Sequence, residues 1–335
     1  MYNVDQITQM HAEISSVCQA GCIDCSRLIE IDDKWYANSF CNNLNSNYDT
    51  QSFLDHVDQF TGLARIDFCG NNGDPMSHPD IVYICERLNL KKLFCTIATN
   101  GAVGSTDKYQ RLAELGVEIT FGIDGLEDTN HIYRRGVLWN KLMQNVKSFI
   151  DSGGSAEWQW LDFPWTRHQI DLARSMSLDL GFKNFFIKSR NNKDLDNHIK
   201  NNKHKPTPRD LIKLPTKRRE QNYSQQLEST MPKDIDTISC QSANQREIYL
   251  QVDGTVWPCC WLPQEQQNND ESKQKFWKGL YENYFNSLHH NTAEEIIKHK
   301  FYQDDLKKQN QFEHTENVKF LSCIKYCGRC NAKSK

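Results

Sequence analysis

Residues 17–25 read VCQAGCIDC and place three cysteines, at positions 18, 22 and 25, in one short loop. Cysteines spaced so closely are typical metal ligands. A structural zinc site closes four ligands, usually in paired Cys-x2-Cys units, whereas this loop offers three. An iron–sulfur cluster on three thiolates would leave one iron open to a reacting ligand. The alternatives are three buried structural cysteines, or zinc with His11 as a fourth ligand.

The composition is typical of a globular protein: of 335 residues, 38% are hydrophobic and 25% charged, and the net charge of −3 indicates little about partners. No apolar run approaches the ~20 residues of a membrane helix. Residues 1–15 lack the basic and apolar regions of a signal peptide. We therefore expect a cytoplasmic protein that does not contact a membrane. The odd count of 13 cysteines argues for metal or redox chemistry rather than a disulfide framework.

From residue 6 to 190 the pattern alternates between strand-like and helix-like segments. The expected strands are 10–15, 64–68, 93–98, 117–123, 157–163 and 183–188, and the expected helices are 50–60, 79–88 with Pro79 in the first turn, 107–115, 138–150 and 166–180. Such alternation predicts an α/β fold with a parallel sheet and helices outside it. Strand number alone does not separate a partial barrel from an open, doubly wound sheet.

Residues 191–236 are polar and rich in proline and basic residues, which predicts a linker. Residues 237–335 then form a compact unit. Asp253-Gly254 predicts a β-hairpin within residues 246–260, and helices are expected over 273–288 and 292–306. The predicted organisation is therefore a core over 1–190, a linker over 191–236 and a small domain over 237–335.

The Cys-x3-Cys-x2-Cys loop, following the first strand of a β/α alternation, resembles the radical S-adenosylmethionine (SAM) enzymes. The resemblance implies a partial (β/α)6 barrel and a 4Fe–4S cluster on Cys18, Cys22 and Cys25. In that family the open iron chelates the amino and carboxylate groups of SAM. An electron from the cluster cleaves SAM to methionine and a 5′-deoxyadenosyl radical, which abstracts hydrogen from the substrate.

Other segments after expected strands fit the same resemblance. CGNNGDP, residues 69–75, matches a family turn that holds the SAM amino group, with Asp74 in place of the usual glutamate. The residues TNG, 99–101, and GIDG, 122–125, match two further family segments. Ligands gather at the carboxyl ends of strands in α/β sheets. The resemblance thus implies SAM contacts from these positions: Gly70, Asn71, Asn72, Gly73, Asp74, Asn100 and Asp124.

Two further residues have proposed roles. Asp24 stands where the family usually has an apolar residue near adenine, and it would instead accept a hydrogen bond from the adenine amino group. Cys69 would donate a hydrogen atom to a substrate radical, and a purely structural role is the alternative. Cys85 and Cys95 lie in apolar patterns and are expected in the core. Cys41 is a second thiol that could act near a substrate radical.

The C-terminal cysteines follow the pattern Cys-x13-Gly-x4-Cys, with Cys-x2-Cys later. This resembles the twitch domain, a shortened SPASM domain that holds one auxiliary 4Fe–4S cluster. The resemblance implies ligation by Cys240, Cys259, Cys327 and Cys330, with Cys260 or Cys323 able to replace Cys259 or Cys327. A structural zinc site of four cysteines is the alternative.

The expected function is radical SAM chemistry on an unknown substrate, either a peptide or protein or a small polar molecule. The expected partners are a flavodoxin- or ferredoxin-type electron donor and that substrate. The absence of an evident winged-helix segment at the N-terminus disfavours leader-dependent peptide maturation. The basic stretch 190–220 leaves nucleic acid open as a substrate. The alternative class is a non-catalytic iron–sulfur or zinc regulatory protein.

Overall fold

The computed structural model describes residues 3–22, 25, 27–31, 34–37, 46–188, 212–213, 237–263, 284–306, 323 and 327–329. The chain forms two compact units. The first comprises Met1–Ala12, Gln51–Arg65 and Leu214–Lys335, and the second comprises Glu13–Thr50 and Ile66–Lys213. Among the described helices, none combines the length and apolar character that crossing a membrane requires.

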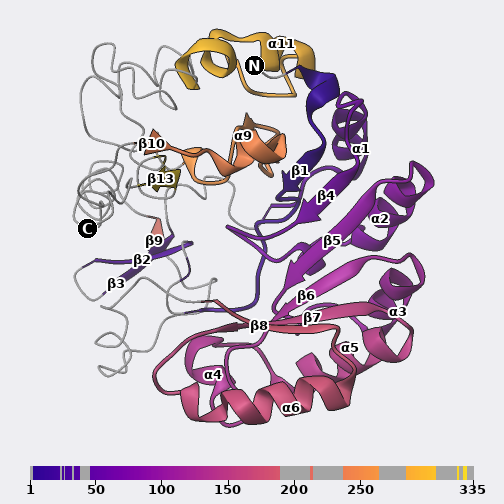
Figure 1. Ribbon diagram of the computed structural model, residues 1–335, viewed down its shortest axis with the longest axis vertical. Helices are drawn as coiled ribbons and strands as arrows, with labels where there is room; N and C mark the ends of the chain where they lie inside the picture. Colours follow the sequence, from indigo (N-terminus) through magenta and orange to yellow (C-terminus); the bar gives the residue numbers. More distant parts are fainter. Residues whose placement is uncertain are drawn as a thin grey trace, which may run out of the picture. The chain divides into compact units, whose positions relative to one another are not determined.

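The second unit contains a sheet whose strands follow one another in chain order. These strands are β4 (Arg65–Phe68, of which Arg65 belongs to the first unit), β5 (Phe94–Thr99), β6 (Glu118–Gly122), β7 (Ser155–Leu161) and β8 (Asn184–Lys188). The pairs β5–β6, β6–β7 and β7–β8 are parallel. The connecting helices are α2 (Ile81–Leu90), α3 (Thr106–Glu114), α4 (Asn130–Tyr133), α5 (Trp139–Asp151) and α6 (Ile170–Leu180). Figure 1 shows α2, α3 and α5 along one side of these strands.

Hydrophobic periodicity explains these elements. Strand β7 alternates between half-buried and buried residues, and it buries Trp158 and Trp160 completely. Helix α5 buries Leu142, Val146 and Phe149, which share one face at helical spacing. Helix α6 ends at Gly181, whose φ of 88° is left-handed, a conformation that glycine adopts without steric cost.

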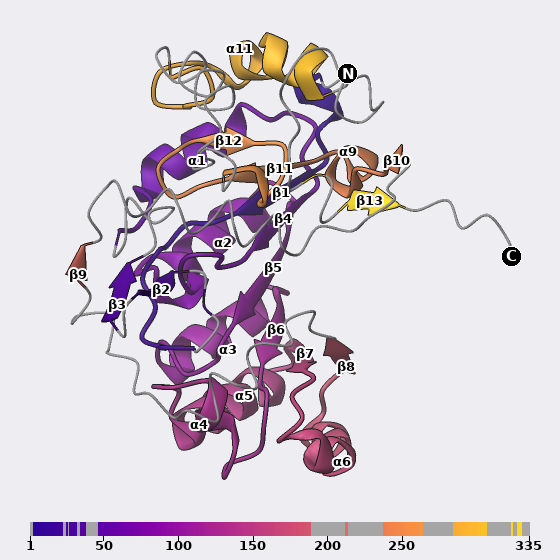
Figure 2. The ribbon, with the colours of Figure 1, turned by 90° about the vertical axis from the view of Figure 1, so that its left-hand side faces the viewer.

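A small sheet also belongs to the second unit. Strands β2 (Leu28–Ile31) and β3 (Lys34–Ala37) are antiparallel, and β9 (Ile212–Lys213) pairs with β3 in parallel. Figure 2 shows β2, β3 and β9 together. The sequence analysis did not anticipate these strands, because each is short and lacks a sustained apolar alternation.

The first unit joins both ends of the chain. Strand β1 (Gln9–Ala12) pairs in parallel with β11 (Glu247–Leu250), which pairs antiparallel with β12 (Val256–Trp257). Strand β10 (Thr237–Ile238) pairs antiparallel with β13 (Gly328–Arg329), and both lie beside α9 (Gln241–Gln245) in Figure 2. The described helices also include α1 (Thr50–Asp58), α11 (Ala293–Lys298) and a π-helical turn (Phe301–Asp305).

The structure confirms the strand–helix alternation and the hairpin, with three corrections. The expected helix over 273–288 is wrong at its end, because 284–288 form turns and Ser287 bridges to Thr255. The expected helix over 292–306 is interrupted at His299, whose ψ is 146°. Pro79 precedes α2 rather than lying in its first turn, since Asp80 is the N-cap. The rest of the 273–288 helix lies outside the described residues.

Candidate metal centres

The three-cysteine loop lies in the second unit, after residue 15, and is fixed by backbone hydrogen bonds. Cys22 is buried, whereas Cys18 and Cys25 are half-buried. The Gly21 amide donates to the Arg135 carbonyl at 2.8 Å, and the Cys25 amide donates to the Cys22 carbonyl at 3.2 Å. The fold therefore presents three thiols from one short, anchored loop.

Arg27, two residues after Cys25, contacts the cysteine loop with its side chain. Its side chain is only 2% exposed. Nη2 donates to the Ala20 carbonyl at 2.7 Å, Nη1 donates to the Cys18 carbonyl at 3.4 Å, and Nε donates to the Cys25 sulfur at 3.4 Å. The sequence analysis missed Arg27, although it follows the third cysteine by two residues.

The turn after β4 packs against the start of the cysteine loop. A Cβ at Gly73 would lie 2.0 Å from the Ser15 carbonyl oxygen, so only glycine fits there. The Asp74 amide donates to the Val17 carbonyl at 2.8 Å. On the other side, both the backbone N–H and the side-chain amide of Asn72 donate to the Glu13 carboxylate. The turn is thus held close to the cysteines through its backbone.

Asp74 is the polar centre of this region. Its Oδ1 accepts from the Met76 amide at 3.0 Å and from the Thr99 hydroxyl at 2.8 Å. Its Oδ2 accepts from the Asn100 backbone amide at 2.9 Å and from the Asn100 side-chain amide. Because these four donors occupy the lone pairs of the carboxylate, Asp74 joins the turn to the end of β5.

Asn100 extends this network to the cysteines. Its side-chain amide lies 3.6 Å from the Cys18 sulfur, and its Oδ1 accepts from the Gln19 amide at 2.8 Å. The predicted residues Asp74 and Asn100 and the cysteine loop therefore meet in one place. Gly70 is exposed, while Cys69, Asn71 and Gly73 are half-buried and Asn72 is buried.

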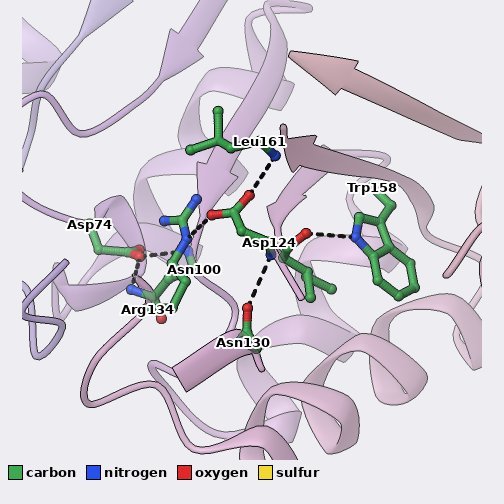
Figure 3. A network of polar contacts seen from close by, with 8 residues as sticks. Asp74, Asn100, Asp124, Asn130, Arg134, Trp158 and Leu161 are labelled. Carbon is green, nitrogen blue, oxygen red and sulfur yellow. Dashed lines mark hydrogen bonds and ion pairs between the residues drawn. The ribbon is translucent and has the colours of Figure 1, made fainter. Parts of the chain in front are cut away.

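A buried ion pair lies after β6 (Figure 3). Arg134 Nε donates to Asp124 Oδ2 at 2.6 Å, and Asp124 Oδ1 accepts from the Leu161 amide at 2.8 Å. The guanidinium packs on Gly122, where a Cβ would lie 2.5 Å from Nη2. Among the described residues, neither Nη1 nor Nη2 of Arg134 has a hydrogen-bond partner. The two NH2 groups of this half-buried cation could therefore bind an anionic ligand.

Burial controls the ionisation of these groups. Burial, and secondarily Asp74, raises the pKa of the Cys18 thiol to about 12. Burial also raises the pKa of Cys22, against the opposing charge of Arg134. For Arg134 itself burial acts against the charge, but Asp124 and Cys22 outweigh it and raise the pKa of the guanidinium. Metal binding to these cysteines would therefore release protons.

A second group of cysteines lies in the first unit. Cys240 forms a side-chain hydrogen bond with Cys327, and Cys259 and Cys323 are near enough to raise its pKa further. Burial, followed by the charge of Cys260, raises the pKa of Cys259 to about 12. The Ser239 amide donates to the Cys327 carbonyl at 2.9 Å, which fixes the β10–β13 pair between them.

Some predicted site residues cannot be placed. Asp24, Cys41 and Cys330 lie outside the described residues. In the described part of the chain, no three His, Cys, Asp or Glu side chains converge on one metal ion. A 4Fe–4S cluster takes each thiolate on a separate iron. Cys85 and Cys95 are buried in the core, as predicted.

The chain matches known proteins over this region. The model of the radical SAM superfamily matches residues 14–158. The PqqA peptide cyclase of Methylorubrum extorquens strain PA1 is 25% identical over 120 residues, which are 36% of this chain and 29% of that protein. The match thus spans less than a third of the length of that curated relative.

Two solved structures share the fold. Streptococcus suis SuiB bound to precursor peptide SuiA has a TM-score of 0.57 at 15% identity, over 95% of this chain and 70% of SuiB. Native anSMEcpe with bound AdoMet and a Cp18Cys peptide has a TM-score of 0.53 at 13% identity, over 96% and 89%. AdoMet is SAM.

The family match and the shared fold point the same way. Residues 14–158 match the model of the radical SAM superfamily, and the α/β fold with its parallel strands is shared with SuiB and anSMEcpe. A domain of that superfamily would take SAM and a 4Fe–4S cluster as cofactors. The residues fit this pair, since three thiols on one loop suit a cluster, and a glycine turn and a half-buried cation suit a zwitterionic amino acid group.

Proposed function

We propose that this chain is a radical SAM enzyme whose 4Fe–4S cluster is held by Cys18, Cys22 and Cys25. The observation that carries the proposal is the chain of contacts from Asp74 through Asn100 to Cys18, which brings a polar ligand site to the cysteine loop. With its cofactors bound, such a site supplies reductive cleavage of SAM to a 5′-deoxyadenosyl radical.

Different residues around the loop would bind the carboxylate and the amino group of SAM. Arg134, whose charge acts on Cys22, would bind the SAM carboxylate. The turn 70–74 would receive the amino group, with Asp74 organising the turn, and this assignment remains a prediction. Asp124 would act by holding Arg134 in place. Asp24 would contact adenine.

A decisive test is SAM cleavage by the full chain. After anaerobic reconstitution with iron and sulfide and reduction with dithionite, the protein should convert SAM to 5′-deoxyadenosine. Cleavage would exclude a purely regulatory metal protein. Stoichiometric iron without any SAM binding or cleavage would contradict the proposal and favour that regulatory class.

We propose a second 4Fe–4S cluster on Cys240, Cys259, Cys327 and Cys330, in a twitch-like domain over 237–335. The support is the proximity of Cys240, Cys259 and Cys327 within the first unit. Such a cluster would accept an electron or position the substrate. About eight irons and no zinc per chain would support it, whereas about four irons and one zinc would make this a zinc module.

A peptide or protein is the proposed substrate class. The named relatives include a peptide cyclase and structures bound to a precursor peptide and to a Cp18Cys peptide. An electron donor of the flavodoxin or ferredoxin type would supply electrons. Peptides encoded beside this gene should stimulate 5′-deoxyadenosine formation and change in mass. Stimulation by aminoglycoside-type alcohols or RNA instead would overturn this assignment.

Cys69 is a proposed hydrogen donor. It is half-buried and directly precedes the turn 70–74. Its S–H bond would break to give a hydrogen atom to a carbon radical of the substrate, which forms a C–H bond and leaves a thiyl radical. One electron from the electron donor and one proton from solvent would restore the thiol. Cys69→Ala should then stop product formation while SAM cleavage continues. Unchanged product formation would leave Cys69 with a structural role.

A further inference from the structure

Arg27 contacts the cysteine loop at three points, and it lies outside the segments that resemble radical SAM enzymes. Its three N–H contacts reach the carbonyls of Cys18 and Ala20 and the sulfur of Cys25. A single side chain thus joins the first cysteine, the middle of the loop and the last cysteine. No backbone contact of the loop spans the same three points among the described residues.

One contact joins Arg27 to a candidate metal ligand. Because Arg27 is only 2% exposed, its guanidinium has lost most of its hydration. Two of the three contacts with the loop are made to neutral carbonyls, and one is made to the Cys25 sulfur. An N–H group binds a thiolate more strongly than a thiol, because the bond is then charge-assisted. The arrangement therefore gains most when Cys25 is a metal-bound thiolate.

We infer that Arg27 is a positioning residue that closes the loop around the cluster and eases one-electron reduction of that cluster. This inference rests on the proposed cluster at Cys18, Cys22 and Cys25. A positive charge and an N–H···S bond both favour the more negative, reduced state. Arg27 would thus raise the reduction potential as well as slow the loss of iron.

The geometry requires arginine rather than any cation. Three separate N–H groups in one rigid plane reach three acceptors at once, which the single ammonium of lysine cannot do. Arg27→Lys therefore keeps the charge but loses the link between the ends of the loop. Arg27→Met keeps the approximate length and loses both. The two variants separate the electrostatic effect from the mechanical one.

The experiment compares wild type, both variants and Arg111→Met as a control. Arg111 lies on the surface, in ion pairs with Glu86 and Glu114. Each protein is reconstituted anaerobically, and two quantities are measured: the half-life of the cluster under an iron chelator, and its midpoint potential by EPR-monitored titration. The signal that changes on addition of SAM identifies this cluster.

We expect Arg27→Met to shorten the half-life and to lower the ratio of reduced to oxidised cluster about tenfold at a fixed potential, since a charge-assisted hydrogen bond is lost. That ratio corresponds to about 59 mV for one electron. Arg27→Lys should shorten the half-life as much but shift the potential less. Arg111→Met should match wild type in both.

The outcomes separate this inference from the proposed function. If wild type holds the cluster and cleaves SAM, but Arg27→Met has an unchanged potential and half-life, the role of Arg27 is wrong and the enzyme proposal stands. If wild type binds no cluster that responds to SAM, both are wrong. If Arg27→Met fails to fold, the half-life of the cluster in Arg27→Lys provides the test. A wild-type half-life in that variant would contradict the loop-closing role of Arg27.

Discussion

The two groups of cysteines differ in what surrounds them. The loop with Cys18, Cys22 and Cys25 comes from one short stretch. The Asn100 amide contacts Cys18, the Arg27 guanidinium contacts Cys25, and the charge of Arg134 acts on the pKa of Cys22. The second group draws Cys240, Cys259 and Cys327 from distant parts of the chain. There the main neighbours are other thiols and backbone amides.

This difference suggests two kinds of site. Nitrogen donors beside the first loop would stabilise negative charge on sulfur. Neighbouring thiolates would repel one another, which raises the pKa of each thiol, and a bound metal relieves that repulsion. Under the proposed function the first site serves reduction and ligand binding, whereas the second depends on the folded first unit for its assembly.

The largest expected effect comes from removing one cysteine at each site. Cys22→Ala should abolish SAM cleavage and remove about four irons, because the cluster loses one of three thiolates. Cys259→Ala should also remove about four irons but keep SAM cleavage in the absence of substrate. Iron analysis and 5′-deoxyadenosine assays measure both. Loss of SAM cleavage in Cys259→Ala would show that the two sites are not independent.

Much of the second unit could be predicted from the sequence. Strong periodicity marked β7 and α5, and the cysteine spacing and strand ends marked Cys18, Asp74 and Asn100. Spacing does not reveal which charges are buried together, so Arg27 and Arg134 were missed, although Arg134 follows shortly after the GIDG segment, residues 122–125.

Other misses have a local cause. Residues 284–288 carry a helix-like apolar pattern, yet Tyr284 has a φ of 46° and Ser287 pairs with Thr255. Here pairing with the hairpin overrides local propensity. The short strands β2, β3 and β9 leave too few residues for a period to show.

Gly73→Ala tests whether the first site needs its close backbone approach. The added Cβ would overlap the Ser15 carbonyl at 2.0 Å, so the turn must move away from the cysteine loop. A displacement of about 1 Å can cost about a hundredfold at a site of this kind, and we expect SAM affinity to fall by that order. Equilibrium binding to the reconstituted protein measures it. The second cluster should keep its iron, and normal SAM affinity would show that the turn is not part of the site.

Arg134→Met tests the proposed carboxylate contact. Loss of a charged hydrogen-bond donor costs about 1.5–3 kcal/mol, which is roughly ten- to a hundredfold in the SAM dissociation constant. The change also removes the ion-pair partner of Asp124. The double variant Arg134→Met/Asp124→Asn therefore serves as the matched control. If the double variant recovers wild-type affinity, Arg134 does not bind SAM and only neutralises Asp124.

Asp74→Asn should have the smallest effect and distinguishes an organising role from direct ligand contact. Asparagine keeps the size of the side chain and one carbonyl acceptor. Its amide nitrogen, however, would face one of two donor groups: Met76 and Thr99 on one side, or Asn100 on the other. If Asp74 only organises the turn, SAM affinity should fall about tenfold or less, since the cost is one mismatched hydrogen bond. It should fall further if the carboxylate itself binds the SAM ammonium. Binding of SAM and of S-adenosylhomocysteine, which share the amino group, should then weaken equally. A loss of iron from Cys18, Cys22 and Cys25 would contradict both roles, because neither involves a thiolate.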